Sequence, residues 1–261
     1  MFAVNLVRTA RLALRLAWYD IKVQRRETFL GLLWVVAWPL VQAAALILVF
    51  QLLRGGGQQP GVGALLLTYC GVLIWTTASS VLLSALNALK VNRELVTQVR
   101  IPVATLVVSD VTAKYLFFLV QLALAVVAWL VVTPHEQWTA VLLTLPVYVA
   151  AFYVALLAMA WVASIAGVAL PDMSVALPPV MLLLLALSPV FQAGHPDLPG
   201  AILVLNQVNP LCLWVASFYA TIGAGGFSPG WPWEFLAWSL LAAGVARVLV
   251  DAAYWKIVKV I

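Results

Sequence analysis

Residues 19–40 read "YDIKVQRRETFLGLLWVVAWPL", and this stretch joins a charged segment directly to an apolar one. Charged residues crowd positions 20–27, and the next charged residue after Glu27 is Arg54. An uncharged, mostly apolar run of this length is long enough to cross the hydrocarbon core of a bilayer. We therefore predict a membrane boundary here, with the charged side in water and Phe29 onward in lipid.

The composition of the whole chain supports the same interpretation. Of its 261 residues, 65% are hydrophobic and only 9% are charged, and the mean hydropathy is +1.08. Soluble domains carry about 25% charged residues. Long apolar runs recur along the sequence, and such runs are typical of transmembrane helices. We predict an all-α integral membrane protein, with one transmembrane domain over residues 1–261 and no soluble domain.

Six membrane spans are predicted, and their orientation follows from the cations beside them. The spans cover about 29–53, 62–83, 103–132, 140–169, 175–191 and 233–250. Lys and Arg concentrate in the N-terminal segment, in the loop after the second span and in the C-terminal tail. Because cytoplasmic flanks are enriched in Lys and Arg, both termini are predicted to be cytoplasmic.

Three segments outside the spans have distinct predicted structures. Arg8, Arg11 and Arg15 share one helical face within residues 1–26, which predicts an amphipathic helix on the membrane surface. The inner loop at 87–101 is polar and could form a short surface helix. The outer loop at 194–232 is long and apolar in its middle, so we expect 200–225 to form a re-entrant helical pair near the outer face.

The sequence lacks the common signatures of catalysis. No glycine is followed by lysine, so there is no Walker A loop for nucleotide phosphates, and no GxSxG or HExxH motif occurs. Cysteines and histidines are isolated from one another, so no metal site is predicted and buried, unreactive thiols are expected. The net charge of +5 does not indicate nucleic-acid binding, because most cations lie just outside apolar runs. We predict no enzymatic activity and no cofactor for this chain.

Ionisable residues inside predicted spans raise a functional question. Asp110 and Lys114 lie four residues apart on the third span, so their side chains can pair. We favour a structural ion pair near the cytoplasmic end over a proton or ion relay, because a relay usually needs several acids along its path. Arg247, late in the last span, is expected to extend its side chain to the inner surface.

Twelve tryptophans are present, and several lie at predicted span ends, where an interfacial belt explains them. Trp34, Trp38, Trp75 and Trp161 are predicted to lie deeper. Aromatic faces stack on the C–H faces of sugar rings, so these residues could line a path for a glycan. Packing or lipid contact explains them equally well.

Four motifs resemble the permease subunits of type-2 ABC exporters for polysaccharides. "RRETFLGLLWVVAWPLVQAAALILVFQLL" is similar to the family's first span, and "NRELVTQVRIPVATLVVSD" to its inner loop and third span. "VALPDMSVALP" resembles the inner turn between the fourth and fifth spans, although Pro171 stands where relatives often have Arg. "NQVNPLCLWVASFYATIGAG" resembles an outer Asn-Pro segment. The matches run through nearly the whole chain in order.

The resemblance implies a bacterial inner-membrane permease that exports a lipid-linked, O-antigen-like polysaccharide. Two copies of this chain would form the pore, and two separate ABC ATPase subunits would bind ATP and Mg²⁺. The implied roles of individual residues fall into three groups. Arg8, Arg11, Arg15, Trp34, Trp38 and Trp75 would contact substrate; Lys90, Asn92, Arg93, Glu94 and Arg100 would couple to the ATPase; Asn209 and Pro210 would form the outer gate.

Other interpretations stay open at this point. For Arg8, Arg11 and Arg15, anchoring to anionic lipid explains the cations as well as a substrate headgroup does. Within the same family, the exported polymer could be a capsular polysaccharide or a teichoic acid. From a different class, the chain could be an ion-coupled secondary transporter that uses Asp110 and Lys114. A membrane enzyme acting on lipid-linked sugars is disfavoured by the scarcity of acids and histidines.

Overall fold

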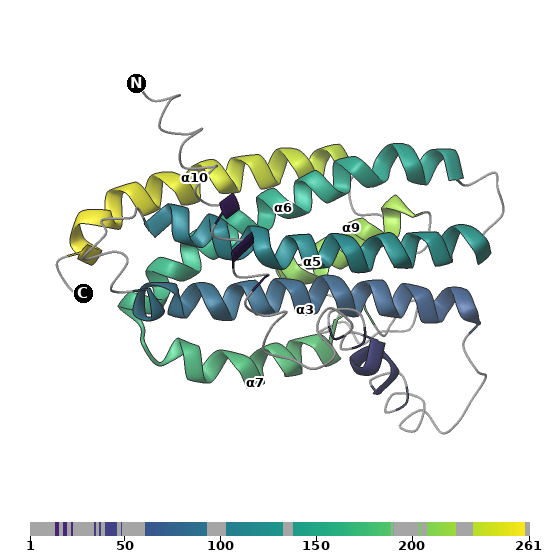
Figure 1. Ribbon diagram of the computed structural model, residues 1–261, viewed down its shortest axis with the longest axis horizontal. Helices are drawn as coiled ribbons and strands as arrows, with labels where there is room; N and C mark the ends of the chain where they lie inside the picture. The colour runs from purple at the N-terminus through teal and green to yellow at the C-terminus, as the bar shows by residue number, and fades with distance from the viewer. Residues whose placement is uncertain are drawn as a thin grey trace.

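The computed structural model is a bundle of nearly parallel and antiparallel helices (Figure 1). The structure describes residues 61–92, 103–132, 138–188, 190, 204, 208–222 and 232–258, together with the helical positions 14, 15, 18, 19, 22, 34, 37, 40–45 and 48. Within these residues the secondary structure is helical and contains no strand, which confirms the all-α prediction. In hydrocarbon a helix bonds its own backbone groups, so the apolar sequence and the helical fold agree.

Three long helices form the centre of the bundle. These are α3 (Val62–Val91), α5 (Val103–Val132) and α6 (Trp138–Ala169), and α3 packs against both α5 and α6. The last long helix, α10 (Pro232–Val258), packs mainly on α6. The chain direction alternates from α3 to α5 to α6, so the end of α3 and the start of α5 lie at the same end of the bundle (Figure 1). We call this the Val91 end, and the opposite one the Val62 end.

Four described helices are long and apolar enough to cross a membrane, so the prediction of six spans is not confirmed. They are Val62–Val91, Ala104–Val132, Val141–Ala169 and Trp233–Ala252. The predicted third and fourth spans match these closely. The helix predicted at 62–83 continues to Val91, and the one predicted at 233–250 belongs to a helix that continues to Val258. The first predicted span lies mostly outside the described residues.

The predicted fifth span, 175–191, corresponds to a much shorter helix. Helix α7 (Met173–Ala186) has 14 residues, which gives a length of about 21 Å against a hydrocarbon core of about 30 Å. Its end at Ala186 has a cause in the sequence, because Pro189 follows closely and disfavours helical geometry at the residue before it. Pro178 and Pro179, inside α7, remove two further backbone donors. The apolar composition of 175–191 therefore overstated the length of the helix.

The predicted re-entrant pair at 200–225 is likewise not confirmed as a pair. Helix α9 (Pro210–Thr221) is a buried helix of 12 residues that packs against α3, α6 and α10. Before α9, the structure describes only Val204, Val208 and Asn209 of the predicted pair. The short length of α9 excludes it as a membrane span by itself.

Hydroxyl groups from neighbouring helices hold α9 in place. The Tyr148 hydroxyl of α6 donates to the Trp214 carbonyl at 3.0 Å, and Thr144 Oγ1 donates to the Thr221 carbonyl at 3.1 Å. The Tyr219 hydroxyl of α9 donates to the Leu67 carbonyl of α3 at 3.1 Å. These bonds join the first halves of α3 and α6 to α9, so α9 lies toward the Val62 end.

An aromatic core fills the space around these bonds. Tyr148 is fully buried, with ring centroids 5.2 Å from Phe218 and 5.5 Å from Phe235. Phe152 lies 4.9 Å from Phe118 of α5 and 5.7 Å from Trp214 of α9 by the same measure. These separations are typical of favourable ring pairs, so α5, α6, α9 and α10 share one packed interior.

Helices α3 and α6 approach each other closely at Gly167 of α6. A Cβ atom placed there would lie 1.9 Å from the Leu86 carbonyl oxygen of α3. Because the opposing atom belongs to the backbone, no side-chain rotation could relieve the clash. Small residues allow this kind of close helix packing in membranes, and here glycine is required.

We predict that Gly167→Ala destabilises the fold by roughly 2 kcal/mol, because α3 and α6 would have to separate. Gly244→Ala is the matched control, since a Cβ atom on this α10 residue meets nothing within 4 Å. The thermal midpoint of each variant, measured in detergent micelles, should fall for Gly167→Ala and stay level or rise slightly for Gly244→Ala. Equal midpoints would contradict the close α3–α6 contact.

Candidate functional site

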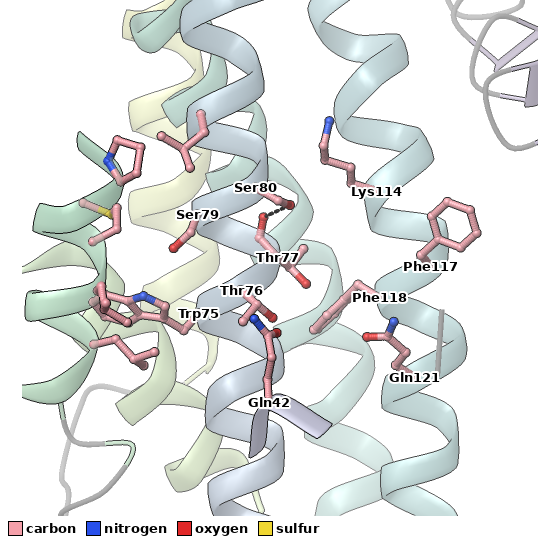
Figure 2. Close-up of a pocket in the computed structure, with 15 residues that line it drawn as sticks. Gln42, Trp75, Thr76, Thr77, Ser79, Ser80, Lys114, Phe117, Phe118 and Gln121 are labelled. Carbon is pink, nitrogen blue, oxygen red and sulfur yellow. Dashed lines mark hydrogen bonds between the residues drawn. The ribbon is translucent and has the colours of Figure 1, made fainter. Parts of the chain in front are cut away.

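A groove of about 450 Å³ crosses the face of α3 between α5 and α7. Most of its lining surface is apolar, and we call it the polar groove after the hydroxyl and amide side chains that also line it. This volume lies within the range of small-molecule sites. One side is apolar and includes Pro178, Met181 and Leu185 of α7. The polar side chains that line the groove come from α3, α5 and the helical segment at 40–45, and Figure 2 shows them around α3: Gln42, Thr76, Thr77, Ser79, Ser80, Lys114 and Gln121.

The hydroxyls of α3 occur at helical spacing along this face. Thr76, Ser80 and Ser84 follow one another at intervals of four residues, which places them on one side of the helix. Two of these hydroxyls donate back to their own helix, Thr76 to the Leu73 carbonyl at 3.2 Å and Ser80 to the Thr77 carbonyl at 2.9 Å. Such bonds let a hydroxyl lie in an apolar bundle while its oxygen can still accept a further hydrogen bond.

A charged cluster lies beside the groove, where α3 and α5 meet toward the Val91 end. Lys114 forms an ion pair with Asp110, one turn away on α5. Ser84 of α3 joins both residues: its hydroxyl donates to Asp110 Oδ2 at 2.5 Å and accepts from Lys114 Nζ at 2.9 Å. The ion pair predicted from the four-residue spacing is confirmed, and Ser84 is a partner that the spacing alone did not reveal.

The depth of this cluster follows from helix geometry. Asp110 lies about 10 Å from the Val103 end of α5, which is itself about 45 Å long. If the 30 Å hydrocarbon core is centred on the helix, about 7 Å projects at each end, so Asp110 lies near the boundary and Lys114 about 9 Å inside it. The side chains of Lys114 and Asp110 are 25% and 36% exposed, so the protein does not enclose the pair, and water at the membrane boundary can reach the Asp110 carboxylate.

The predicted substrate-contacting tryptophans differ in their environment. Trp75 is buried at 2% exposure and lines the groove, whereas Trp34 is 44% exposed. Trp38 lies outside the described residues. Trp161 packs beneath Arg247, whose guanidinium carbon is 5.8 Å from the ring centroid, a distance typical of a cation–π contact. Only Trp75 of these four therefore belongs to the groove.

None of the predicted headgroup, coupling and gate residues that the structure describes lines the groove. Arg15 is helical and exposed, while Arg8 and Arg11 lie outside the described residues. Lys90 is exposed in the last turn of α3, and Asn92 follows as its C-cap, donating from its side-chain amide to the Ala88 carbonyl at 2.9 Å. Arg93, Glu94 and Arg100, which belong to the same predicted coupling loop, lie outside the described residues.

Asn209 and Pro210, the predicted gate residues, begin helix α9. The Asn209 side chain accepts a hydrogen bond from the Leu211 backbone N–H at 3.0 Å, and Pro210 occupies the first helical position. Both residue types are favoured at these positions for local reasons, so the motif has a structural explanation in helix capping. Asp172 likewise precedes α7 as its N-cap residue, although its side chain makes no capping hydrogen bond.

The groove residues that the sequence interpretation missed are neutral and polar. Gln42 lies within the first-span motif but was given no role, and Gln121 and the α3 hydroxyls belong to no motif, although the spacing of the hydroxyls on α3 was visible. Cys70 and Cys212 are buried free thiols. No group of three or more His, Cys, Asp or Glu side chains that could hold a metal ion occurs in the part of the chain that the structure describes.

Comparisons with known proteins give no assignment. The chain matches no protein-family model. Compared with curated proteins, it gives no significant match.

Because Asp110 and Lys114 form an ion pair, we expect substitutions at the two positions to have non-additive effects on stability. Lys114→Met leaves the Asp110 carboxylate without its cation and should cost about 1 to 2 kcal/mol, less than for a fully buried pair because water reaches the site. Adding Asp110→Leu removes the unpaired charge and should recover at least half of the loss. Thermal midpoints of both variants check this, and a double variant less stable than Lys114→Met would contradict the coupling.

Proposed function

We propose that this chain is the membrane-spanning, pore-forming subunit of an ATP-driven exporter of lipid-linked polysaccharide, acting as a homodimer with two separate ATPase subunits. The polar groove carries the proposal. A hydroxyl- and amide-lined groove inside an apolar bundle supplies hydrogen-bonding partners to a sugar chain that would otherwise cross hydrocarbon without any.

The distribution of charge supports the predicted orientation. Lys90 lies in the last turn of α3, at the Val91 end, and Arg247 lies in the second half of α10, which runs toward the same end (Figure 1). Glu234 lies in the first turn of α10. Because cytoplasmic flanks are enriched in Lys and Arg, the two cations favour a cytoplasmic location for the Val91 end. Residues 93–102, which connect α3 to α5, would then face the cytoplasm, where an ATPase could dock, and the bacterial inner membrane would be the site of the complex.

The sequence supports a separate energy source. It has no Walker A motif, so the ATP and Mg²⁺ that drive export would be bound by the partner ATPase. An O-antigen-like polymer is the proposed cargo, with capsular polysaccharide and teichoic acid as variants of the same activity. The N-terminal segment with Arg8, Arg11 and Arg15 would lie at the cytoplasmic interface and contact the phosphate headgroup of the lipid carrier.

Charge reversal at the coupling loop tests the partnership. Tagged protein purified from its native host in mild detergent should retain an ABC ATPase, and Lys90→Glu with Arg93→Glu should reduce that retention about tenfold through unfavourable charge at the interface. Glu234→Lys, at the opposite end of the bundle, is the control and should retain the ATPase. Purification of the wild-type chain without any nucleotide-binding partner would argue strongly against the proposal.

Loss of the chain should trap its cargo. A strain that lacks this chain should accumulate lipid-linked glycan on the cytoplasmic face of the inner membrane, because synthesis continues while export stops. The glycan that accumulates, identified by mass spectrometry, distinguishes O-antigen from capsule and teichoic acid. Normal surface glycan in such a strain, with no accumulated intermediate, would contradict an export role.

The Ser84–Asp110–Lys114 cluster supports one candidate from another class, an ion-coupled secondary transporter. A carboxylate held near the hydrocarbon boundary by a lysine and a hydroxyl could bind and release a proton or cation. Gradient-driven uptake by the purified chain in proteoliposomes without an ATPase, abolished by Asp110→Asn, would favour this candidate over the exporter.

A further inference from the structure

The polar groove carries no net charge. Lys114 is its only charged lining residue among those described, and Asp110 lies against the same ammonium group. Ser84 bonds to both partners, which fixes the pair in one arrangement. The remaining polar groups that line the groove are hydroxyls and amides. A ligand in the groove therefore meets balanced charge rather than an electropositive surface.

Two polar atoms in the groove have unused hydrogen-bonding capacity. Gln42 Oε1 and Ser79 Oγ are buried side-chain atoms without a hydrogen-bond partner within the described structure. An amide oxygen accepts hydrogen bonds and donates none, whereas a hydroxyl can do both. A buried polar atom left without a partner costs about 1 to 3 kcal/mol, so these atoms favour a ligand that brings hydroxyl donors with it.

Sugar hydroxyls and phosphodiesters differ in what they offer such a site. A sugar hydroxyl donates and accepts, so it can pair with Gln42 Oε1 and with Ser79. A phosphodiester group of a teichoic acid only accepts, and it carries a negative charge that the groove does not compensate. Moving a poorly compensated charge into a poorly hydrated site is unfavourable, and the Asp110 carboxylate beside Lys114 offsets most of the attraction that the ammonium group would exert on a phosphodiester.

We propose that the groove selects neutral, polyhydroxylated glycan segments and discriminates against polymers with a phosphodiester backbone. This inference rests on the proposed export function, because it names the class of polymer that the same groove accepts. The selectivity arises from the balance of Lys114 by Asp110 and from the unused acceptor of Gln42. Of the polymers proposed as cargo, this selectivity favours uncharged polysaccharides over teichoic acid.

Binding to the full-length chain in lipid nanodiscs tests the selectivity. Equilibrium dialysis with a labelled glucose oligomer and a labelled glycerol-phosphate oligomer of equal length should show tighter binding of the glucose oligomer. Gln42→Leu should weaken glucose-oligomer binding roughly fivefold, and Ser79→Ala should also weaken it. Asp110→Asn, which leaves Lys114 uncompensated, should tighten glycerol-phosphate binding by about tenfold.

Ser164→Ala is the matched control for Ser79→Ala. The Ser164 hydroxyl is also buried and bonds to the Trp161 carbonyl at 2.8 Å, but it lies on α6 and does not line the groove. This variant should bind the glucose oligomer like the wild type, and the thermal midpoint of each variant checks that it is folded.

Equal or tighter binding of the glycerol-phosphate oligomer by the wild type would overturn the inference. So would glucose-oligomer binding that Gln42→Leu leaves unchanged, or a wild-type chain that binds neither oligomer. ATPase retention and glycan accumulation decide the export function separately. A chain that retains its ATPase but prefers the phosphate polymer would therefore disprove the selectivity alone.

Discussion

Hydrogen bonding inside an apolar bundle is the constraint on which the rest of this structure depends. A polar side chain that enters hydrocarbon must find a partner within the protein, because lipid offers none. Most hydroxyls of α3 meet this requirement by donating to carbonyls of their own helix, as Thr68 does to Ala64 at 2.9 Å. Tyr148, Tyr219 and Thr144 donate instead to carbonyls of neighbouring helices, and these bonds fix a short helix within the bundle.

The same constraint separates the groove from the core. In the core around Tyr148, the hydroxyls of Tyr148, Tyr219 and Thr144 are paired and the rings are closely packed. In the groove, Gln42 and Ser79 hold buried polar atoms without a partner among the described residues, and Lys114 is one of the lining residues. These core hydroxyls are thus bonded within the protein, while the groove has hydrogen-bonding capacity for an additional molecule. This contrast is the physical basis for placing the functional site between α3, α5 and α7.

Sequence reasoning predicted the parts of the fold that depend on composition and period. The runs at 103–132 and 140–169 are predominantly apolar, and the observed helices follow them within two residues at each end. It failed where apolar composition and helix length diverge: residues 175–191 are apolar, yet α7 ends at Ala186 before Pro189. Falling hydropathy placed the end of the second span at position 83, yet α3 continues as a helix through the polar residues Asn87 and Lys90.

The site was harder to predict than the fold for a physical reason. The pairing of Asp110 with Lys114 is local on one helix, so the four-residue spacing revealed it. Ser84 and Gln42 approach the groove from other segments, and only the tertiary packing brings them near α5. Asn209 and Pro210 formed a conspicuous pair in the sequence, but their positions at the start of α9 are those that a helix cap requires.

The contact at Gly167 also limits how this protein can change shape. With the Leu86 carbonyl this close to the α6 backbone, no side chain separates the two helices at this point, so no side-chain reorientation there can accommodate sliding of one helix along the other. Shear motions between packed helices rely on small adjustments of interfacial side chains. Helices α3 and α6 should therefore travel as a single rigid unit, and α7, which contacts them less extensively, is the element whose displacement would widen the groove.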